Sequence, residues 1–308
     1  MQILVLGSAA GGGFPQWNCN CANCCRARAG DPAAPPRTQS SLAVSADGER
    51  WLLLNASPDL RQQILVNPAL HPRRGARHSP IAAVVLSNGD VDHVAGLLTL
   101  RENQPLAVYG SDRIHAALRG NSVFNVLNPA VVARRPLALD ERLAVMAFDG
   151  TELGLQVTAF AVPGKVALYM ENEKAGPGFG TQSGDTIGLE IRTDEERRFF
   201  YLPACASLSP DLAGRLRAAP LVFFDGTLWQ DDEMISMGVG TKTGRRMGHM
   251  SIGGGEGSLA AFASLGVQRR IYVHINNTNP ILIAGSPERV QVEAAGWEVA
   301  YDGMETRL

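Results

Sequence analysis

The stretch Asn88-Gly-Asp90-Val-Asp92-His93 follows the apolar segment 81–86, whose length and β-branched content predict a buried strand. It places two carboxylates and an imidazole at the end of that strand, in a loop that opens a helix predicted over 93–102. Carboxylate and imidazole ligands suit a metal ion such as Fe(II), Mn(II) or Zn(II). For any one of these residues an ordinary helix start is the alternative, because the helix dipole favours acidic side chains there.

Two further predicted strands also end at a polar residue. Segment 221–224 leads into Asp225, and segment 271–273 leads into His274. Sites in α/β proteins collect at strand ends, because a rigid element there aims a short loop. We therefore expect the three strand ends to share one cleft.

Apolar runs of strand length recur along the chain, and helical patterns lie between some of them. We predict strands over 3–6, 51–54, 81–86, 107–109, 155–159, 199–202, 221–224 and 271–273. We predict helices over 59–66, 93–102, 112–118, 210–218, 259–265 and 287–295. The alternation indicates an α/β fold, and neighbouring strands without a helix, such as 40–45 and 51–54, predict hairpins and hence mixed sheets. No loop is long enough to be a linker, so residues 1–308 are expected to form a single domain.

The composition limits the class of protein. The chain has 308 residues, of which 45% are hydrophobic and 19% charged, which is enough apolar material for a real core. A net charge of −2 offers no surplus positive charge for nucleic acid, and no apolar run approaches the roughly 18 residues of a membrane span. Segment 1–7 reads as a strand and not as a signal peptide. We expect a cytoplasmic protein without nucleic-acid or membrane partners, and the sequence leaves open whether it forms a homodimer.

Four of the five cysteines fall within seven residues, at Cys19, Cys21, Cys24 and Cys25. In a reducing compartment such a cluster is more often a metal site than a disulfide framework. Three thiolates suit a structural Zn²⁺, which needs a fourth ligand. Cys25 and a remote His or Asn brought in by the fold are both candidates. The fifth cysteine, Cys205, is expected to pack in the core.

Basic residues offer a candidate for binding an acidic ligand. Arg245 and Arg246 stand just before His249 and can bind carboxylates bidentately, although a solvated arginine pair is the alternative. Only three lysines occur, which we attribute to composition bias: Lys165, Lys174 and Lys242.

The first motif also carries a resemblance. Asn88-x-Asp90-x-Asp92-His93 resembles the His-x-His-x-Asp-His motif of the metallo-β-lactamase superfamily, with the last two positions kept and the first two changed. Other stretches resemble the superfamily's branch in pyrroloquinoline quinone (PQQ) biosynthesis, namely Gly7–Cys21, Ser87–His93, Phe223–Trp229 and Val273–Pro280. The resemblance implies an αββα four-layer sandwich, with two mixed sheets face to face and helices outside.

The changed positions imply that one of the superfamily's two usual zinc sites is dismantled. A third histidine would fall near Pro163–Lys165, and the bridging carboxylate near Pro203–Cys205, but neither stretch supplies one. What survives is a single set of ligands, Asp92, His93 and His274. Two imidazoles and one carboxylate are the ligand set of non-haem Fe(II) oxygenases, although Zn²⁺ accepts such a set too.

The resemblance assigns further roles around this centre. Asp90, Asp225 and His249 become candidate extra ligands, proton-transfer groups or residues that hold the ligands. The histidine that completes a three-cysteine zinc site in a related phosphodiesterase corresponds to Asn277, with Cys25 as its competitor. Trp17 and Trp229 are candidate ring contacts, with core packing as the alternative.

The implied function is a step of PQQ biosynthesis, which starts from a peptide whose Glu and Tyr side chains become cross-linked. The ligand set favours an Fe(II)- and O₂-dependent hydroxylase of the tyrosine-derived ring in the excised intermediate. That intermediate is a small polycarboxylate, which Arg245 and Arg246 would bind. The alternatives are a zinc-dependent hydrolase of a pathway intermediate and a carrier that binds PQQ or its precursor without chemistry.

Overall fold

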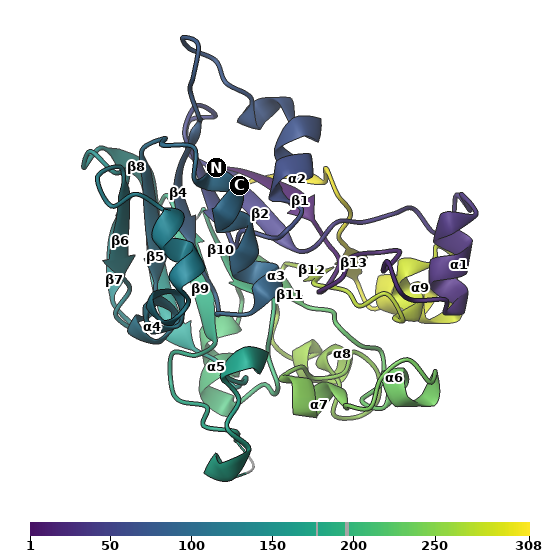
Figure 1. Cartoon of the computed structure of the whole chain (residues 1–308). Coiled ribbons are helices and arrows are strands. Elements are labelled where there is room, and N and C mark those ends of the chain that lie inside the picture. Colours follow the sequence, from purple (N-terminus) through teal and green to yellow (C-terminus); the bar gives the residue numbers. More distant parts are fainter. Residues whose placement is uncertain (177, 195–196) are drawn as a thin grey trace.

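In the computed structural model, which describes residues 1–176, 178–194 and 197–308, two mixed β-sheets stack face to face with helices outside them (Figure 1). The first sheet contains β1 (Gln2–Gly7), β2 (Ser41–Ser45), β3 (Trp51–Leu54), β4 (Ile81–Val85), β5 (Leu106–Gly110), β6 (Val132–Pro136) and β14 (Glu305–Arg307). The second contains β7 (Arg142–Met146), β8 (Glu152–Ala161), β9 (Ile187–Arg192), β10 (Arg198–Leu202), β11 (Leu221–Asp225), β12 (Arg269–Val273) and β13 (Trp297–Val299). The α-helices are α1 (Ala22–Arg28), α2 (Leu60–Val66), α3 (Val91–Val94), α4 (Asp112–Gly120), α5 (Pro210–Leu216), α6 (Glu233–Ser236), α7 (Gly244–Met247), α8 (Ser258–Phe262) and α9 (Pro287–Ala294).

The strand order is β14-β1-β2-β3-β4-β5-β6 in the first sheet and β13-β12-β11-β10-β9-β8-β7 in the second. Both sheets combine antiparallel and parallel pairs, because β2–β3 and β9–β10 are antiparallel whereas β4–β5 and β11–β12 are parallel. The predicted four-layer αββα sandwich with mixed sheets is thereby confirmed.

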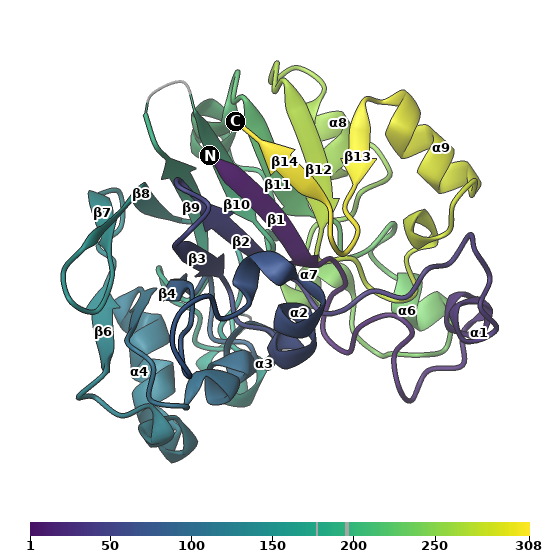
Figure 2. The same ribbon diagram turned by 90° about the horizontal axis from the view of Figure 1, so that it is seen from above.

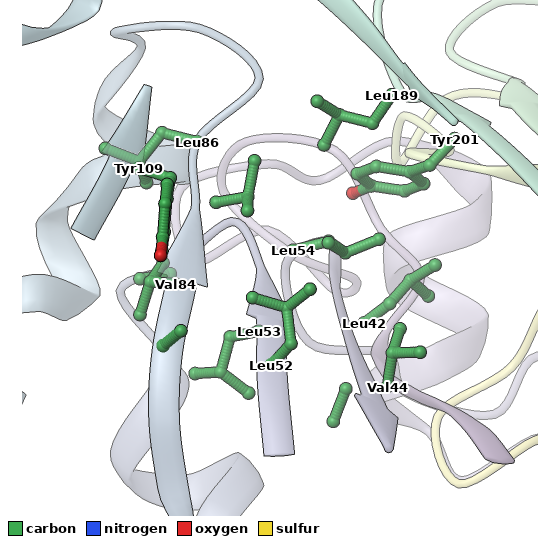
Figure 3. Close-up of a cluster of buried hydrophobic side chains, with 14 of the residues drawn as sticks. Leu42, Val44, Leu52, Leu53, Leu54, Val84, Leu86, Tyr109, Leu189 and Tyr201 are labelled. Carbon is green, nitrogen blue, oxygen red and sulfur yellow. The ribbon is translucent and has the colours of Figure 1, made fainter. Parts of the chain in front are cut away.

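The central strands are apolar on both faces because both faces are covered. In β11, Leu221 and Phe223 point into the core between the sheets, whereas Val222 and Phe224 join a second core under α5, α8 and α9. Figure 3 shows part of the core between the sheets, where Leu54 of β3 faces Tyr201 of β10. Burial on both faces explains why these strands read as continuous apolar runs.

The two ends of the chain lie side by side (Figure 2). β1 pairs with β14, and the amino group of Met1 donates to the carbonyl of Leu308 at 2.7 Å. No helix in the described ranges is long and apolar enough to cross a membrane.

Each predicted strand and helix forms, with shifted ends. The helix expected over 93–102 is α3 followed by the 3₁₀ turn Ala95–Leu100. The sequence analysis missed β6, β7, β9, β13, β14, α1, α6 and α7. Most of these are short or polar, so the period of their apolar residues gives little signal.

Candidate metal centre

A cleft of about 380 Å³ opens where β4, β11 and β12 end. Asn88, Asp90 and Asp92, which follow β4, contribute one wall, and Thr227 and His274, which follow β11 and β12, also line it. The expectation that the three strand ends share one cleft is confirmed.

Asp92, His93 and His274 offer ligand atoms that all lie within 4.8 Å of one another. His274 Nε2 lies 3.0 Å from Asp92 Oδ2, and His93 Nε2 lies 3.9 Å from the same oxygen. Within the described residues, the buried Nε2 of His93 has no hydrogen-bond partner. A buried polar atom without a partner is costly, and coordination to an ion would remove that cost. The residues present therefore fit a metal ion.

Asn88, at a position where the superfamily motif has histidine, fixes the orientation of His93. Its Oδ1 accepts from the backbone N–H of Asp90 at 3.0 Å and lies 2.7 Å from His93 Nδ1. Because this oxygen is an acceptor, His93 carries its proton on Nδ1 and turns an unprotonated Nε2 towards the centre. Burial lowers the pKa of His93 to about 4, which keeps the ring neutral at physiological pH.

Thr227 holds His274 in the same way. Its hydroxyl donates to Asp225 Oδ1 at 2.6 Å, so it accepts from His274 Nδ1 at 2.9 Å. His274 Nε2 is thus left for the centre. Burial lowers the pKa of His274, but the hydrogen bond and charge of Asp92 outweigh burial, and the net shift is upward. Its Nε2 lies 3.0 Å from Asp92 Oδ2, where an ion would bind both groups.

Replacing Thr227 with valine should weaken metal binding about 10- to 100-fold, because the tautomer and ring orientation of His274 are then no longer fixed. Thr227→Ser retains the hydroxyl and is expected to bind nearly as the unchanged protein does. Titration of the metal-free proteins with Zn²⁺ against a competing chelator measures the difference. Equal affinities for the valine and serine variants would contradict this role.

His249 and Asp225 form a second pair beside the centre. His249 lines the cleft, and its Nδ1 donates to Asp225 Oδ2 at 2.7 Å. The other ring nitrogen, Nε2, takes no part in that hydrogen bond. Asp225, His249 and His274 also lie close enough to hold an ion. However, the Thr227 hydroxyl lies within 3.1 Å of Asp225 Oδ1 and of the Nδ1 atoms of His249 and His274, so these atoms are engaged with a protein partner.

Asp90 lines the cleft but does not cap α3, since its side chain makes no capping hydrogen bond. Its Oδ1 accepts from the backbone N–H of Leu168 at 3.3 Å and lies 3.7 Å from Lys165 Nζ. Burial raises the pKa of Asp90, and this effect is larger than that of the Lys165 charge, which lowers the pKa. Lys165 lies after β8, in the stretch where the superfamily's third histidine would fall.

The arginine pair does not line this cleft. Arg246 donates both guanidinium nitrogens to Glu171, at 3.0 and 2.6 Å, and stacks on Phe179. Arg245 pairs with Glu256 at the surface and lines a different pocket. The structure therefore corrects the assignment of Arg245 and Arg246 to the binding cleft.

The cations that do line the cleft are Lys165 and Lys242, two of the three lysines in the chain. The scarcity of lysine, attributed above to composition, was therefore a signal for this cleft. Trp17 is 86% exposed and so neither packs in the core nor lines the cleft.

Cys19, Cys21 and Cys24 form a separate cluster in which their sulfur atoms converge. The side-chain amide nitrogen of Asn277 lies 3.1, 3.7 and 3.3 Å from the three sulfurs. Cys25 is exposed, and its sulfur contacts Asn20 instead. The structure thus brings Asn277 to the cluster and leaves Cys25 outside it.

The cysteine cluster also fits a metal ion. Burial raises the pKa of Cys21 to about 12, so this thiol stays protonated unless a cation compensates the thiolate. An amide coordinates through its oxygen, which a half-turn of the Asn277 amide would bring to the sulfurs. Such an ion would fasten the connection between β1 and β2, whose residues Gly11 and Gln16 line the cleft.

Glu233 supports the segment that carries Asn277. It accepts from the hydroxyl of Thr278 and from the backbone N–H of Trp229, and burial raises its pKa to about 7. A raised pKa in the folded state means that folding takes up a proton between about pH 4.5 and 7. The stability that comes with this proton is present below pH 4.5 and is lost as the pH rises through 7.

We therefore expect Glu233→Gln to gain stability relative to the unchanged protein by about 2 kcal/mol between pH 5 and pH 8.5. Urea denaturation of the metal-loaded proteins at the two pH values measures this gain. Parallel pH profiles for the two proteins would contradict the shifted pKa.

Comparisons with known proteins match this fold. A family model described as a beta-lactamase superfamily domain matches residues 50–275, which excludes the cysteine cluster. Two relatives are named coenzyme PQQ synthesis protein B. The one from Rhodopseudomonas palustris is 54% identical and covers both chains fully, and the one from Gluconacetobacter diazotrophicus is 55% identical over 99% of this chain and 98% of the relative.

Solved structures agree. Zn²⁺-bound PqqB from Methylobacterium extorquens has a TM-score of 0.94 and 53% identity, with both chains fully covered. A diphosphatase of the PhnP family shares the fold alone, with a TM-score of 0.68 and 18% identity over 100% of this chain and 97% of that one. Fold and metal cleft thus define a member of the beta-lactamase superfamily. Within it, the chain belongs to the PqqB family of coenzyme PQQ synthesis proteins.

Proposed function

We propose that the protein acts in PQQ biosynthesis as an Fe(II)- and O₂-dependent hydroxylase of the tyrosine-derived ring of the cross-linked Glu–Tyr intermediate. The observation that carries this proposal is the set of two imidazoles and one carboxylate formed by Asp92, His93 and His274. Asn88 is engaged with His93, and the ammonium of Lys165 lies 3.7 Å from Asp90, where its charge opposes a second cation. A binuclear hydrolase centre is thereby disfavoured.

Fe(II) bound by this ligand set would supply sites for dioxygen and substrate. Insertion of one oxygen atom into an aromatic C–H bond leaves the other to be reduced to water by two electrons from a co-reductant such as ascorbate. In the protein, His249 Nε2 is placed to take the proton of a phenol. The Asp225 carboxylate, bonded to His249 Nδ1, stabilises the imidazolium that forms.

The other ion would be structural. We assign Cys19, Cys21, Cys24 and Asn277 to a Zn²⁺ site, because the three sulfurs and the amide converge in a buried place. It would hold the wall of the cleft and take no part in the reaction.

The test is oxygen uptake by anaerobically Fe(II)-loaded protein with ascorbate and a tyrosine-derived tricarboxylate. We expect uptake coupled to a hydroxylated product, with none for Zn²⁺-loaded protein and none for His93→Ala. His78→Ala, which changes a histidine that lines a different pocket, serves as the control. Absence of uptake despite measurable substrate binding would overturn the hydroxylase.

A zinc-dependent hydrolase is the second candidate, because the PqqB structure from Methylobacterium extorquens is described as Zn²⁺-bound. It requires turnover of a pathway intermediate without dioxygen. A Zn²⁺-loaded hydrolysis assay under anaerobic conditions therefore separates the two enzymes. Binding without turnover in either assay would leave the carrier.

A further inference from the structure

Lys242 is a cleft cation whose charge no described carboxylate neutralises by direct contact. It lies between α6 and α7 and lines the metal cleft. Among the described residues it takes part in no ion pair, whereas Arg245 and Arg246 are both paired with glutamates. A lysine is a compact charge on a flexible stem, suited to meeting an incoming anion.

The nearest acidic groups are already engaged by other cations. Glu171 is held bidentately by Arg246, and the ammonium of Lys165 stands between Glu171 and Asp90, 3.7 Å from each. The hydrogen bond from Arg246 is the largest influence on the pKa of Glu171, which is lowered, and Lys242 contributes only a long-range charge. The arrangement leaves Lys242 free for a group from outside the chain.

The other residues that line the cleft indicate what kind of molecule would fit beside Lys242. Met234 and Met247, from the helices on either side of Lys242, line the cleft together with Leu168. Thioethers and a leucine provide an adaptable apolar wall that suits an aromatic ring. The metal ligands Asp92 and His274 line the same space.

We propose that Lys242 binds a carboxylate of the substrate, while the substrate's ring lies between the methionines and the metal ligands. The ligand class is therefore an aromatic acid, and Lys242 selects it over the corresponding amine. This inference rests on the proposed function, since it assigns substrate contacts in the same cleft.

The small number of lysines makes a direct test practical. Zn²⁺-loaded protein, which does not turn over, is acetylated with and without saturating PQQ, and Lys165, Lys174 and Lys242 are quantified by mass spectrometry. We expect PQQ to lower acetylation of Lys242 at least fivefold and to leave Lys174 unchanged. Equal modification of Lys242 with and without bound PQQ would overturn the proposal.

A matched pair of probes tests the carboxylate itself. Dihydroxyphenylalanine and dopamine share one ring, but only the first has a carboxylate. The unchanged protein and Lys174→Met should bind the acid at least tenfold more tightly than the amine, and Lys242→Met should lose this preference while keeping its metal content. No preference in the unchanged protein, no binding of either probe, or a preference that survives in Lys242→Met would each count against the inference.

The outcomes separate this inference from the hydroxylase. Oxygen uptake without protection of Lys242 from acetylation would support the hydroxylase and contradict the carboxylate contact. Protection of Lys242 without oxygen uptake would support the contact and contradict the hydroxylase.

Discussion

Cys24→Ser is expected to release one metal ion per chain and to lower the melting temperature by roughly 10 °C, which corresponds to a loss of about 4 kcal/mol. Cys24 is fully buried, and its sulfur contacts the amide of Asn277. A hydroxyl is a poor zinc ligand in a site built for thiolates. The connection from β1 to β2 would then lose one of its attachments to the segment after β12, while the hydrogen bonds of Asn23 to the same segment remain.

Cys25→Ser is the matched control, because it makes the same chemical change one residue away. The Cys25 side chain is exposed and its sulfur contacts Asn20, so we expect a change within about 0.5 kcal/mol and an unchanged metal content. Elemental analysis and thermal denaturation measure both quantities. If Cys25→Ser lost the ion and Cys24→Ser kept it, the assignment of the fourth ligand to Asn277 would be wrong.

His274→Ala should remove the other ion and lower kcat/KM by at least about a thousandfold, equivalent to about 4 kcal/mol of transition-state stabilisation. His274 supplies one of three ligands, and its loss leaves Asp92 and His93 alone at the centre. The cysteine-bound ion should remain in this variant. Two variants that each lose a different ion would establish two separate sites.

The backbone of His274 provides a check that the loss is chemical and not a failure to fold. Its φ is +55°, in the left-handed region that costs a non-glycine residue about 1–2 kcal/mol. His274→Gly should therefore be more stable than His274→Ala in urea denaturation of the metal-free proteins, although both are inactive. An alanine variant as stable as the glycine variant would show that this conformation relaxes on substitution.

The strands and most of the candidate metal centre could be predicted because both leave local patterns in the sequence. Buried strands such as β11 are short apolar runs, and Asp92 and His93 lie within one motif. The partners of these ligands could not be predicted in the same way. Thr227 is 47 residues from His274 in the chain, and only the parallel pairing of β11 with β12 brings them together.

The assignment of Arg245 and Arg246 rested on their chemistry and on their position just before His249, but the direction in which each side chain leaves α7 decides whether it lines the cleft. The structure places Asn277, and not Cys25, beside the three sulfurs, because adjacent helical residues such as Cys24 and Cys25 point in different directions. Asn277 reaches the sulfurs from a segment more than 250 residues later in the chain.

The segment after β12 contributes His274 to one site and, three residues later, Asn277 to the other. An ion at either position would hold the same short piece of backbone, so any factor by which filling one site changes the affinity of the other must apply equally in the reverse direction. A preparation that lacks zinc at the cysteines would then show a weaker affinity for the ion at the other site. Specific activity should be compared between preparations only at matched zinc content.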